Sequence, residues 1–213
     1  MSEALCASGG SGGSREPRGG SEDEKRRVRA LVRARRRAMS EDARSAAGAL
    51  LAQRLGELVA ETGARSVTCY ASLPDEPATW GFLQWAEREA LEVLLPVIRE
   101  ERGMDWIRAS GELRPGPLGI LEPVGVPATS EELARVELML VPACAVDERG
   151  TRLGWGGGYF DRFLASREQR PPVFALVFDA DVVPGRPGLP RDPHDAPVDG
   201  AVTPERILRF GSG

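Results

Sequence analysis

Histidine and cysteine are scarce in this chain, and each shortage excludes a kind of site. The only histidine among 213 residues is His194, which is too little for a histidine-rich metal centre and leaves little basis for a histidine-dependent triad. The three cysteines, one of them Cys6, are odd in number and widely spaced, so they form neither a disulfide framework nor a zinc site. Cys69 and Cys144 lie in apolar runs, and we expect them to be small buried residues in a reduced cytosol.

Long apolar runs are also missing. No segment reaches the roughly 18 consecutive apolar residues of a membrane span, so we expect no membrane partner. The N-terminus lacks an apolar stretch and carries acidic residues, which does not fit a secretory signal and favours a cytoplasmic protein. The formal net charge of −4 argues against a general nucleic-acid binder.

The chain divides into a tail and one domain. Residues 1–22 are rich in glycine, serine and charge, which predicts a disordered tail ahead of a single domain over 23–213. In that domain short apolar runs alternate with helical patterns, which is typical of an α/β sheet covered on both faces. We expect strands over 66–73, 91–98, 104–109, 137–147 and 173–180, and helices over 23–38, 41–62, 80–90, 129–136 and 159–168. Residues 114–128 are rich in proline and glycine and are expected to form a shaped loop.

Glycines are concentrated in one stretch, TRLGWGGGYFDRF, at residues 151–163. The stretch lies between a predicted buried strand and a predicted helix, where open α/β sheets bind ligands. Glycines leave no Cβ in the way of a ligand, and the N–H groups that start the next helix suit an anion. A flexible turn needs fewer glycines, so the pattern favours a cradle for an anionic ligand, with Arg152 before it and Arg162 after it.

This stretch is not a standard nucleotide motif. It has no Gly-Lys-Ser/Thr, so it is not a Walker A loop, and Tyr159 breaks the G-x-G-x-x-G pattern. Asp161, just inside the predicted helix, has two interpretations that the spacing does not separate. It supplies either favourable charge in a first helical turn or a ligand to Mg²⁺ beside phosphates.

The first predicted helix is strongly basic, with eight of the 13 residues from Lys25 to Arg37 being lysine or arginine. The pattern favours a solvated, arginine-rich face. The alternatives are contact with RNA or DNA phosphates and a supply of cations to a nucleotide site. Lys25 and Arg29 are four residues apart and share one face of the helix.

Two further acidic segments follow predicted strands. Asp75 and Glu76 lie in PDEPAT, where a solvated turn is the simpler interpretation and a carboxylate that binds a heterocyclic amine or amide is the functional one. His194 and Asp195 lie between two prolines in a stiff loop. A lone exposed histidine usually has no role, but Asp195 is a candidate second magnesium ligand.

Taken together, these stretches resemble the 5-formyltetrahydrofolate cyclo-ligase (methenyltetrahydrofolate synthetase) family. The matching segments occur in the family's order from residue 25 to about 207 and are weak singly but fairly specific in combination. They are KRRVR…RRRAMSEDAR, YASLPDEPAT, GPLGILEP, VPACAVDERGTRLGWGGGYFDRFL and LPRDPHDAPVDGAVT.

The resemblance implies a three-layer α/β/α sandwich and an ATP- and Mg²⁺-dependent conversion of 5-formyltetrahydrofolate to 5,10-methenyltetrahydrofolate, with release of ADP and phosphate. In the family mechanism the formyl oxygen attacks the γ-phosphate, and the N10 amine then closes the ring as phosphate leaves. Phosphoryl transfer depends on positioning and charge neutralisation, so the lack of a nucleophilic side-chain pair is expected. The expected partners are 5-formyltetrahydrofolate and ATP, without nucleic acid, and the protein is expected to be a monomer.

The same resemblance implies site residues. Arg152, Tyr159 and Asp161 are the expected catalytic residues, and Asp161 and Asp195 are the expected magnesium ligands. Glu76 is expected to hold the folate, with Ala71 beside it. The expected ATP-binding residues are Lys25, Arg26, Arg27, Val28, Arg29, Arg152, Leu153, Gly154, Trp155, Gly156, Gly157, Gly158, Tyr159 and Phe160. Those also expected to contact folate are Trp155, Gly156, Gly157, Gly158 and Tyr159.

The chain departs from the family pattern at four positions. Trp155 and Gly157 replace residues that are basic in some relatives, and Phe160 stands where tyrosine is common. Leu118 stands where the family often has an aromatic residue, and Trp155 is an alternative stacking surface for the pterin ring.

Two other functions are left open by the residues. A sugar-phosphate isomerase or CoA-transferase-like enzyme on a related fold would bind phosphate at the glycine stretch without hydrolysing ATP. An RNA-binding protein would use the basic helix, although the acidic balance and the lack of an aromatic stacking strip count against it.

Overall fold

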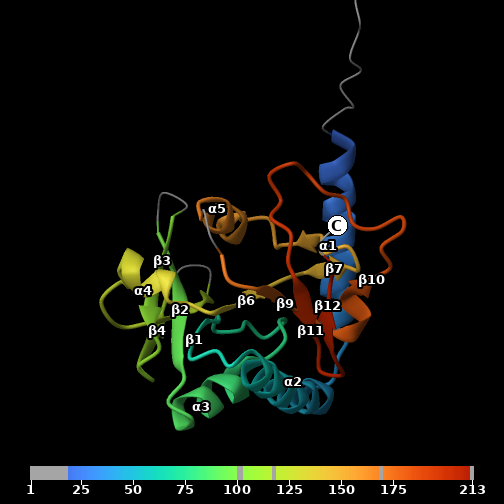
Figure 1. Cartoon of the computed structure of the whole chain (residues 1–213). Helices are drawn as coiled ribbons and strands as arrows, with labels where there is room; N and C mark the ends of the chain where they lie inside the picture. Colours follow the sequence, from blue (N-terminus) through green and yellow to red (C-terminus); the bar gives the residue numbers. More distant parts are fainter. Residues whose placement is uncertain (1–18, 100–102, 117–118, 168–169, 212–213) are drawn as a thin grey trace, which may run out of the picture.

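A mostly parallel sheet of seven strands forms the centre of the molecule (Figure 1). The computed structural model describes residues 19–99, 103–116, 119–167 and 170–211. In sheet order the strands are β12 (Ile207–Arg209), β11 (Gly200–Val202), β9 (Val173–Leu176), β6 (Leu138–Pro142), β1 (Ser66–Thr68), β2 (Glu92–Ile98) and β3 (Met104–Arg108). Every pairing between β11 and β2 is parallel, and the two edge strands are antiparallel. The expected mostly parallel α/β sheet is confirmed.

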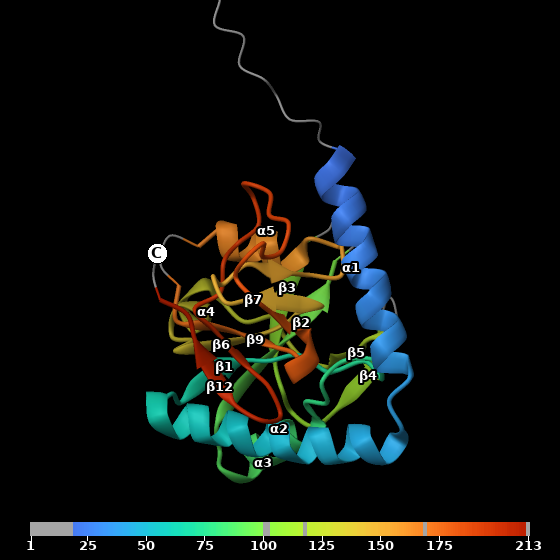
Figure 2. The ribbon, with the colours of Figure 1, turned by 90° about the vertical axis from the view of Figure 1, so that its right-hand side faces the viewer.

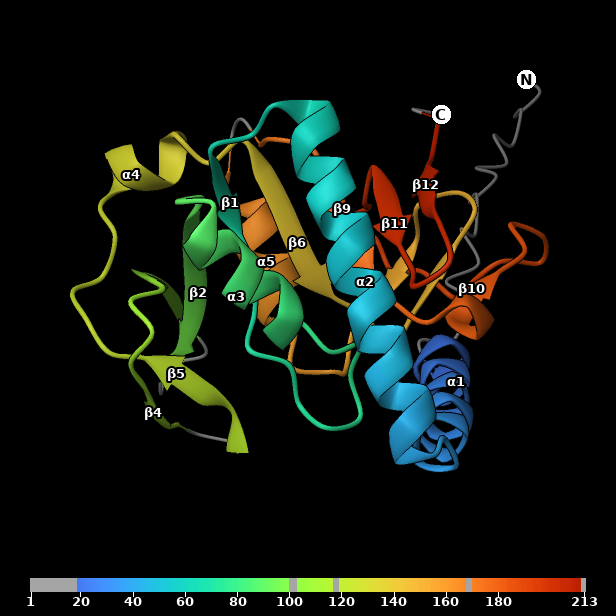
Figure 3. The same cartoon turned by 90° about the horizontal axis from the view of Figure 1, so that it is seen from below.

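Helices cover both faces of this sheet. On one face α2 (Glu41–Thr62) and α3 (Trp80–Arg88) lie side by side across the strands (Figures 1 and 3). Their buried side chains, among them Leu55 and Phe82, join strand residues such as Leu138 and Leu140 in one apolar cluster. On the other face α5 (Tyr159–Ala165) and α4 (Ser130–Ala134) contribute to a second cluster around Trp106. The three-layer α/β/α sandwich is confirmed.

The helix expected over 41–62 is confirmed as α2, and the helix expected over 129–136 is the shorter α4. Ser40 caps α2, since its side-chain oxygen accepts a hydrogen bond of 3.2 Å from the Ala43 N–H, and the helix ends before Gly63 in a left-handed conformation. Thr129 caps α4 in a capping box with Glu132.

The first helix, α1 (Gly19–Arg37), stands at the side of the sandwich (Figure 2). It packs against a small sheet of β10 (Val182–Val183), β7 (Ala145–Asp147) and β8 (Arg152–Leu153), with Val32 and Leu153 in a third apolar cluster. The helix begins at Gly19, so the predicted disordered tail over 1–22 is wrong for residues 19–22. The rest of that tail lies outside the described residues.

Other predicted boundaries also change. The single strand expected over 137–147 is two strands, β6 and β7, which belong to different sheets. The strands expected over 66–73 and 173–180 are shorter, and the helix expected over 159–168 ends at Ala165. The shaped loop expected over 114–128 contains β5 (Leu121–Pro123), which pairs antiparallel with β4 (Leu113–Pro115). Leu118 lies outside the described residues.

Among the described residues, no helix is long and apolar enough to cross a membrane.

Candidate active site

A cavity of 480 Å³ opens where three parallel strands end. Tyr70 and Ala71 follow β1, Pro96 and Ile98 belong to β2, and Pro142 ends β6. The 74–76 turn and the glycine loop, residues 154–158, complete the wall. The lining residues from the predicted set are Ala71, Glu76, Arg152, Gly154, Trp155, Gly157, Gly158, Tyr159, Phe160 and Asp161. A sheet edge at the carboxyl ends of parallel strands is where α/β folds bind ligands.

The glycine loop has one defined shape that other residues do not fit. Gly156 and Gly158 have φ angles of 103° and 65°, a region that side-chain-bearing residues rarely adopt. A Cβ on Gly157 would lie 2.7 Å from the Tyr159 ring. The loop therefore forms part of the cavity wall in a conformation that glycine favours, and the anion cradle stays a prediction.

Arg152 and Asp161 form an ion pair at the two ends of this loop. The Arg152 Nη2 donates to Asp161 Oδ1 at 2.5 Å, and its Nη1 donates to the Pro142 carbonyl at 3.2 Å. The Arg152 side chain is 2 % exposed and that of Asp161 17 %, so the pair is largely shielded from water. Two of the three expected catalytic residues therefore lie together beside the cavity.

Lys25 lies on α1 and pairs with two carboxylates. Its Nζ is 2.8 Å from Asp192 Oδ2 and 2.5 Å from Asp195 Oδ2. Burial acts to lower the pKa of Lys25, but the hydrogen bonds to Asp192 and Asp195 outweigh it and raise the pKa above 10.5. Lys25 is the only lysine among the 28 basic residues of the chain. It is a compact cation held beside the glycine loop.

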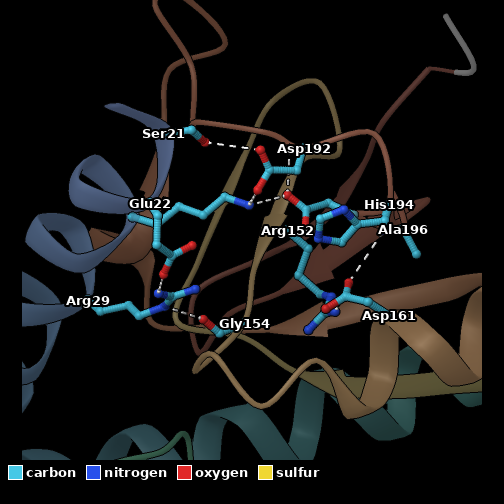
Figure 4. A network of polar contacts seen from close by, with 11 residues as sticks. Ser21, Glu22, Arg29, Arg152, Gly154, Asp161, Asp192, His194 and Ala196 are labelled. Atoms are coloured by element: carbon cyan, nitrogen blue, oxygen red, sulfur yellow. Dashed lines mark hydrogen bonds and ion pairs between the residues drawn. The ribbon is translucent and has the colours of Figure 1, made fainter. Parts of the chain in front are cut away.

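Arg29 connects α1 to the glycine loop directly. Its Nε donates to the Gly154 carbonyl at 2.9 Å, and its Nη1 lies 2.9 Å from Glu22 Oε1 (Figure 4). The pattern favoured a solvated face for this helix, and that interpretation is wrong for Lys25, Arg29 and Arg36, which are buried or largely buried. The remaining basic residues of the helix, including Arg26 and Arg27, are exposed.

Arg36 holds α1 against the sandwich. This buried guanidinium donates to Asp181 Oδ2 at 2.9 Å and to the Ala143, Cys144 and Asp75 carbonyls at 3.1, 3.0 and 3.2 Å. It also lies 5.1 Å from the centre of the Trp155 ring. The helix that carries Lys25 and Arg29 is therefore fixed to the strand end, the 74–76 turn and the glycine loop at once.

Glu76 is a carboxylate in the cavity wall. Its Oε2 accepts a hydrogen bond of 2.9 Å from the Leu73 N–H. Burial raises the pKa of Glu76 above 4.5, although the Leu73 N–H, the Arg36 charge and the Trp155 indole each act in the opposite direction. The Trp155 indole nitrogen is buried and makes no hydrogen bond of normal geometry among the described residues. The Cζ atoms of Arg33 and Arg36 lie 5.2 and 5.1 Å from the centre of the Trp155 ring. Trp155 also lines the cavity.

The donor set suits a hard cation. Asp161 Oδ1 accepts a 3.4 Å hydrogen bond from the Ala196 N–H, which places it next to the segment that carries Asp195. Asp192, His194 and Asp195 have ligand atoms within 4.8 Å of one another. Carboxylate oxygens are what Mg²⁺ prefers, and the Lys25 cation beside two of them marks a place where positive charge is stabilised.

Neither cysteine of the described residues is an activated nucleophile. Burial raises the pKa of Cys69 to about 12 and that of Cys144 to about 11, so both thiols stay protonated near neutral pH. His194 is 79 % exposed.

The structure adds residues that the sequence patterns did not reveal. Tyr70 and Arg33 line the cavity, Asp192 shares Lys25 with Asp195, and Arg36 joins the parts of the site. Two expected ATP-binding residues, Val28 and Leu153, pack in the third apolar cluster, and Lys25 and Asp195 lie outside the cavity lining.

The chain is similar to known proteins of one family. The model of the 5-formyltetrahydrofolate cyclo-ligase family matches residues 21–204. A 5-formyltetrahydrofolate cyclo-ligase from Mycolicibacterium smegmatis is 33% identical over 148 residues, covering 67% of this chain and 75% of its own. A 5-formyltetrahydrofolate cyclo-ligase from Escherichia coli K12 is 27% identical over 185 residues, covering 84% of this chain and 100% of its own.

A solved structure is also similar. The 5,10-methenyltetrahydrofolate synthetase of Aquifex aeolicus aligns with a TM-score of 0.74 and 29% identity over 89% of this chain and 94% of its own. Because the family model spans nearly the whole described domain, the chain belongs to the 5-formyltetrahydrofolate cyclo-ligase family.

Proposed function

We propose that this protein converts 5-formyltetrahydrofolate to 5,10-methenyltetrahydrofolate with ATP, releasing ADP and phosphate. The observation that carries the proposal is the cavity itself, which is lined both by Glu76 and by the Arg152–Asp161 pair at the ends of the glycine loop. A bound folate beside Glu76 and a nucleotide on the loop would share this one space. Membership of the family favours this reaction over the isomerase and RNA-binding hypotheses.

We propose that the nucleotide phosphates lie between α1 and the glycine loop. Lys25 and Arg29 reach this region from one side and Arg152 from the other. In the ligand-free protein Lys25 and Arg152 are paired with aspartates, and phosphate oxygens would take the place of these carboxylates. Arg26, Arg27, Val28 and Leu153 stay predictions, and the side chains of Val28 and Leu153 have little freedom to reach a ligand because they pack in a core.

We propose that Glu76 accepts hydrogen bonds from the N–H groups of the pterin ring, with Ala71 in the adjacent wall. The formyl oxygen then attacks the γ-phosphorus, the bond from that phosphorus to the ADP oxygen breaks, and an amide oxygen becomes a phosphate leaving group. The N10 amine attacks the activated carbon, loses its proton and closes the ring as phosphate departs. Positioning and charge neutralisation supply most of the rate enhancement in such a transfer.

We propose that Asp161 and Asp195 hold a magnesium ion beside the phosphates. Such an ion neutralises the charge that develops on the transferring phosphoryl group. In the ligand-free protein Arg152 pairs with the Asp161 carboxylate and Lys25 with that of Asp195, and both carboxylates become available to the ion when phosphate oxygens take these cations. Tyr159 starts α5 next to Asp161, and its ring is covered by Arg162 at 5.2 Å. The cytoplasmic location and the monomeric state stay predictions.

The test is ADP release that depends on the folate. Addition of 5-formyltetrahydrofolate to the protein with Mg²⁺ and ATP is expected to start ADP formation, and Asp161→Asn is expected to reduce it by about a hundredfold or more. Asparagine can still accept the Arg152 hydrogen bond, so the fold should be retained.

Asp179→Asn is the matched control, because Asp179 is bonded to Thr203 away from the cavity. It should release ADP at the wild-type rate. ADP formation that ignores 5-formyltetrahydrofolate would refute the proposed function, and a fully active Asp161→Asn protein would refute only the magnesium role.

A further inference from the structure

Asp147 is a fully buried carboxylate that the proposed reaction does not use. It ends β7, its side chain is 0 % exposed, and it does not line the cavity. Among the described residues it pairs with one cation, Arg149, whose Nη2 lies 3.6 Å from Asp147 Oδ2 and whose side chain is 56 % exposed. A buried charge is costly unless other groups compensate it, so the contacts of this carboxylate call for an explanation.

Backbone N–H groups from two separate segments bind this carboxylate. Its Oδ1 accepts from the N–H groups of Arg149 and Thr151 at 3.0 and 2.9 Å, inside the turn that joins β7 to β8. Its Oδ2 accepts from the Leu189 N–H at 3.0 Å, 42 residues further along the chain. Asp147 therefore joins the turn between β7 and β8 to the start of a second segment, residues 189–198.

The other end of the 189–198 segment is attached to the same turn. The Val198 N–H donates to the Gly150 carbonyl at 2.9 Å, and the Gly150 N–H donates to the Asp147 carbonyl, also at 2.9 Å. Gly150 has a φ angle of 79°, and a Cβ there would lie 2.5 Å from the Val198 carbonyl oxygen, so this close approach requires glycine. Both ends of the segment are therefore fixed on the turn.

The residues that we propose for magnesium and phosphate binding follow the turn or lie on the segment. The turn leads directly into Arg152, which pairs with Asp161. The segment carries Asp195, whose Oδ2 accepts from Lys25 Nζ at 2.5 Å. The Ala196 N–H donates to Asp161 Oδ1 at 3.4 Å (Figure 4). The position of Asp195 relative to Asp161 therefore depends on how the segment is held on the turn.

We propose that Asp147 is a positioning residue, whose carboxylate fixes the segment that carries Asp195 relative to Asp161. The inference rests on the proposed function, because it takes Asp161 and Asp195 to hold the magnesium ion. It assigns to a carboxylate outside the cavity the role that hydrogen-bonding groups around metal ligands have in other proteins. An ionised carboxylate suits this role because both of its oxygens accept hydrogen bonds, so it can bind both segments at once.

Asp147→Asn tests this link, because asparagine has one acceptor oxygen in place of two. If that oxygen keeps the two bonds inside the turn, the amide NH₂ faces the Leu189 N–H, and two donors then meet. Amide hydrogen exchange in the ligand-free protein should become faster over 189–195 and stay unchanged in α2. The dissociation constant of a non-hydrolysable ATP analogue should rise about tenfold in the presence of Mg²⁺. Without Mg²⁺ the variant and the wild type should bind the analogue equally.

Gly188→Ala disturbs the same contact from the other segment and leaves Asp147 in place. Gly188 has a φ angle of 80°, and a Cβ there would lie 2.9 Å from Asp147 Oδ2. The added methyl group should displace the carboxylate from the Leu189 N–H. This variant should therefore change hydrogen exchange over 189–195 and the Mg²⁺-dependent affinity in the same direction, and it decides the question if Asp147→Asn does not fold.

Glu137→Gln is the matched control. Glu137 Oε2 also accepts a hydrogen bond from a backbone N–H, that of Arg65 at 2.6 Å. Glu137 lies just before β6, whereas Pro142 at the other end of β6 lines the cavity. This control should keep the wild-type hydrogen exchange over 189–195 and the wild-type affinity for the analogue with and without Mg²⁺.

A merely structural role for Asp147 would lower the thermal midpoint of Asp147→Asn and leave the Mg²⁺-dependent affinity of the folded protein unchanged. That result would overturn the inference, as would unchanged hydrogen exchange over 189–195. Failure of the proposed function gives a different result in the wild type measured in parallel. A wild type that binds the analogue with Mg²⁺ but forms no methenyl product refutes the proposed function and not the role of Asp147.

Discussion

Glu76 is a carboxyl group whose charged form is disfavoured in the folded protein. Its pKa is raised by burial, so the folded protein binds the proton more tightly than the unfolded chain does. Protonated Glu76 makes its full contribution to the stability of the folded protein below the unfolded-state pKa. That contribution is lost as the pH rises through the folded-state pKa. A destabilising carboxylate is typical of a functional site, where ligand binding has been selected over stability.

Glu76→Gln is therefore expected to separate stability from function. The variant should unfold at a higher temperature than the wild type at neutral pH. The difference should shrink as the pH falls toward 4.5, the ordinary value for this group, and be absent below it. The Michaelis constant for 5-formyltetrahydrofolate should rise by about tenfold or more, because a hydrogen bond to a charged group is lost. Thermal melts across the acidic range and steady-state kinetics measure both effects. Loss of stability at neutral pH would contradict this account.

The sequence predicted some site residues and missed others for physical reasons. Glu76 and Asp161 were found because each follows a predicted strand or loop at a ligand-binding edge. Tyr70 was missed because an aromatic residue after a buried strand has the same pattern as a core residue, and only the folded structure brings it into the cavity wall. Arg36 was missed because nothing in the sequence distinguishes a buried arginine from the other seven basic residues between Lys25 and Arg37.

At the scale of elements, α1 depends on one buried ion pair. The Arg36 and Asp181 side chains are 1 % and 0 % exposed. The Arg36 cation is also bonded to the Ala143 and Cys144 carbonyls, and the Asp181 carboxylate also pairs with the half-exposed Arg35. The helix buries Val32 but few other apolar side chains. Its attachment to the sandwich therefore rests largely on Arg36.

Arg36→Met should destabilise the protein by up to about 3–5 kcal/mol, because the buried Asp181 then keeps only the half-exposed Arg35 as a charged partner. Arg37→Met should change stability by less than about 1 kcal/mol, since Arg37 makes an exposed ion pair of 3.4 Å with Asp75. Chemical denaturation followed by circular dichroism measures both. The double variant Arg36→Met, Asp181→Leu should recover much of the loss. Equal effects of Arg36→Met and Arg37→Met would show that the buried pair does not anchor α1.

Helices were predicted best where a capping residue close in the sequence determines the first residue of the helix. Ser40 and Thr129 supply the caps of α2 and α4, and their signals are visible in the sequence. The pairing of β4 with β5 was missed because their proline and glycine content is typical of a loop. The division of 137–147 was missed because both halves are equally apolar, and the partner strands alone decide to which sheet each belongs.

At the scale of the whole molecule, the sandwich brings distant segments to one sheet edge. α1 supplies Lys25, the end of β1 leads to Glu76, and the loop before α5 supplies Arg152 and Asp161. The apolar strand runs predicted this architecture, because strands covered on both faces must be apolar throughout. The position of α1 beside the glycine loop was not predictable from these patterns, because it rests on long-range contacts such as Arg29 to Gly154.

The most direct test of the account is the ultraviolet absorbance of 5,10-methenyltetrahydrofolate. The wild-type protein with 5-formyltetrahydrofolate and Mg²⁺ should form the chromophore only after ATP is added, with one ADP released for each molecule of methenyl product. Chromophore that appears at the same rate without ATP, or ADP that accumulates with no chromophore, would contradict the claim that phosphoryl transfer activates the formyl oxygen in this cavity.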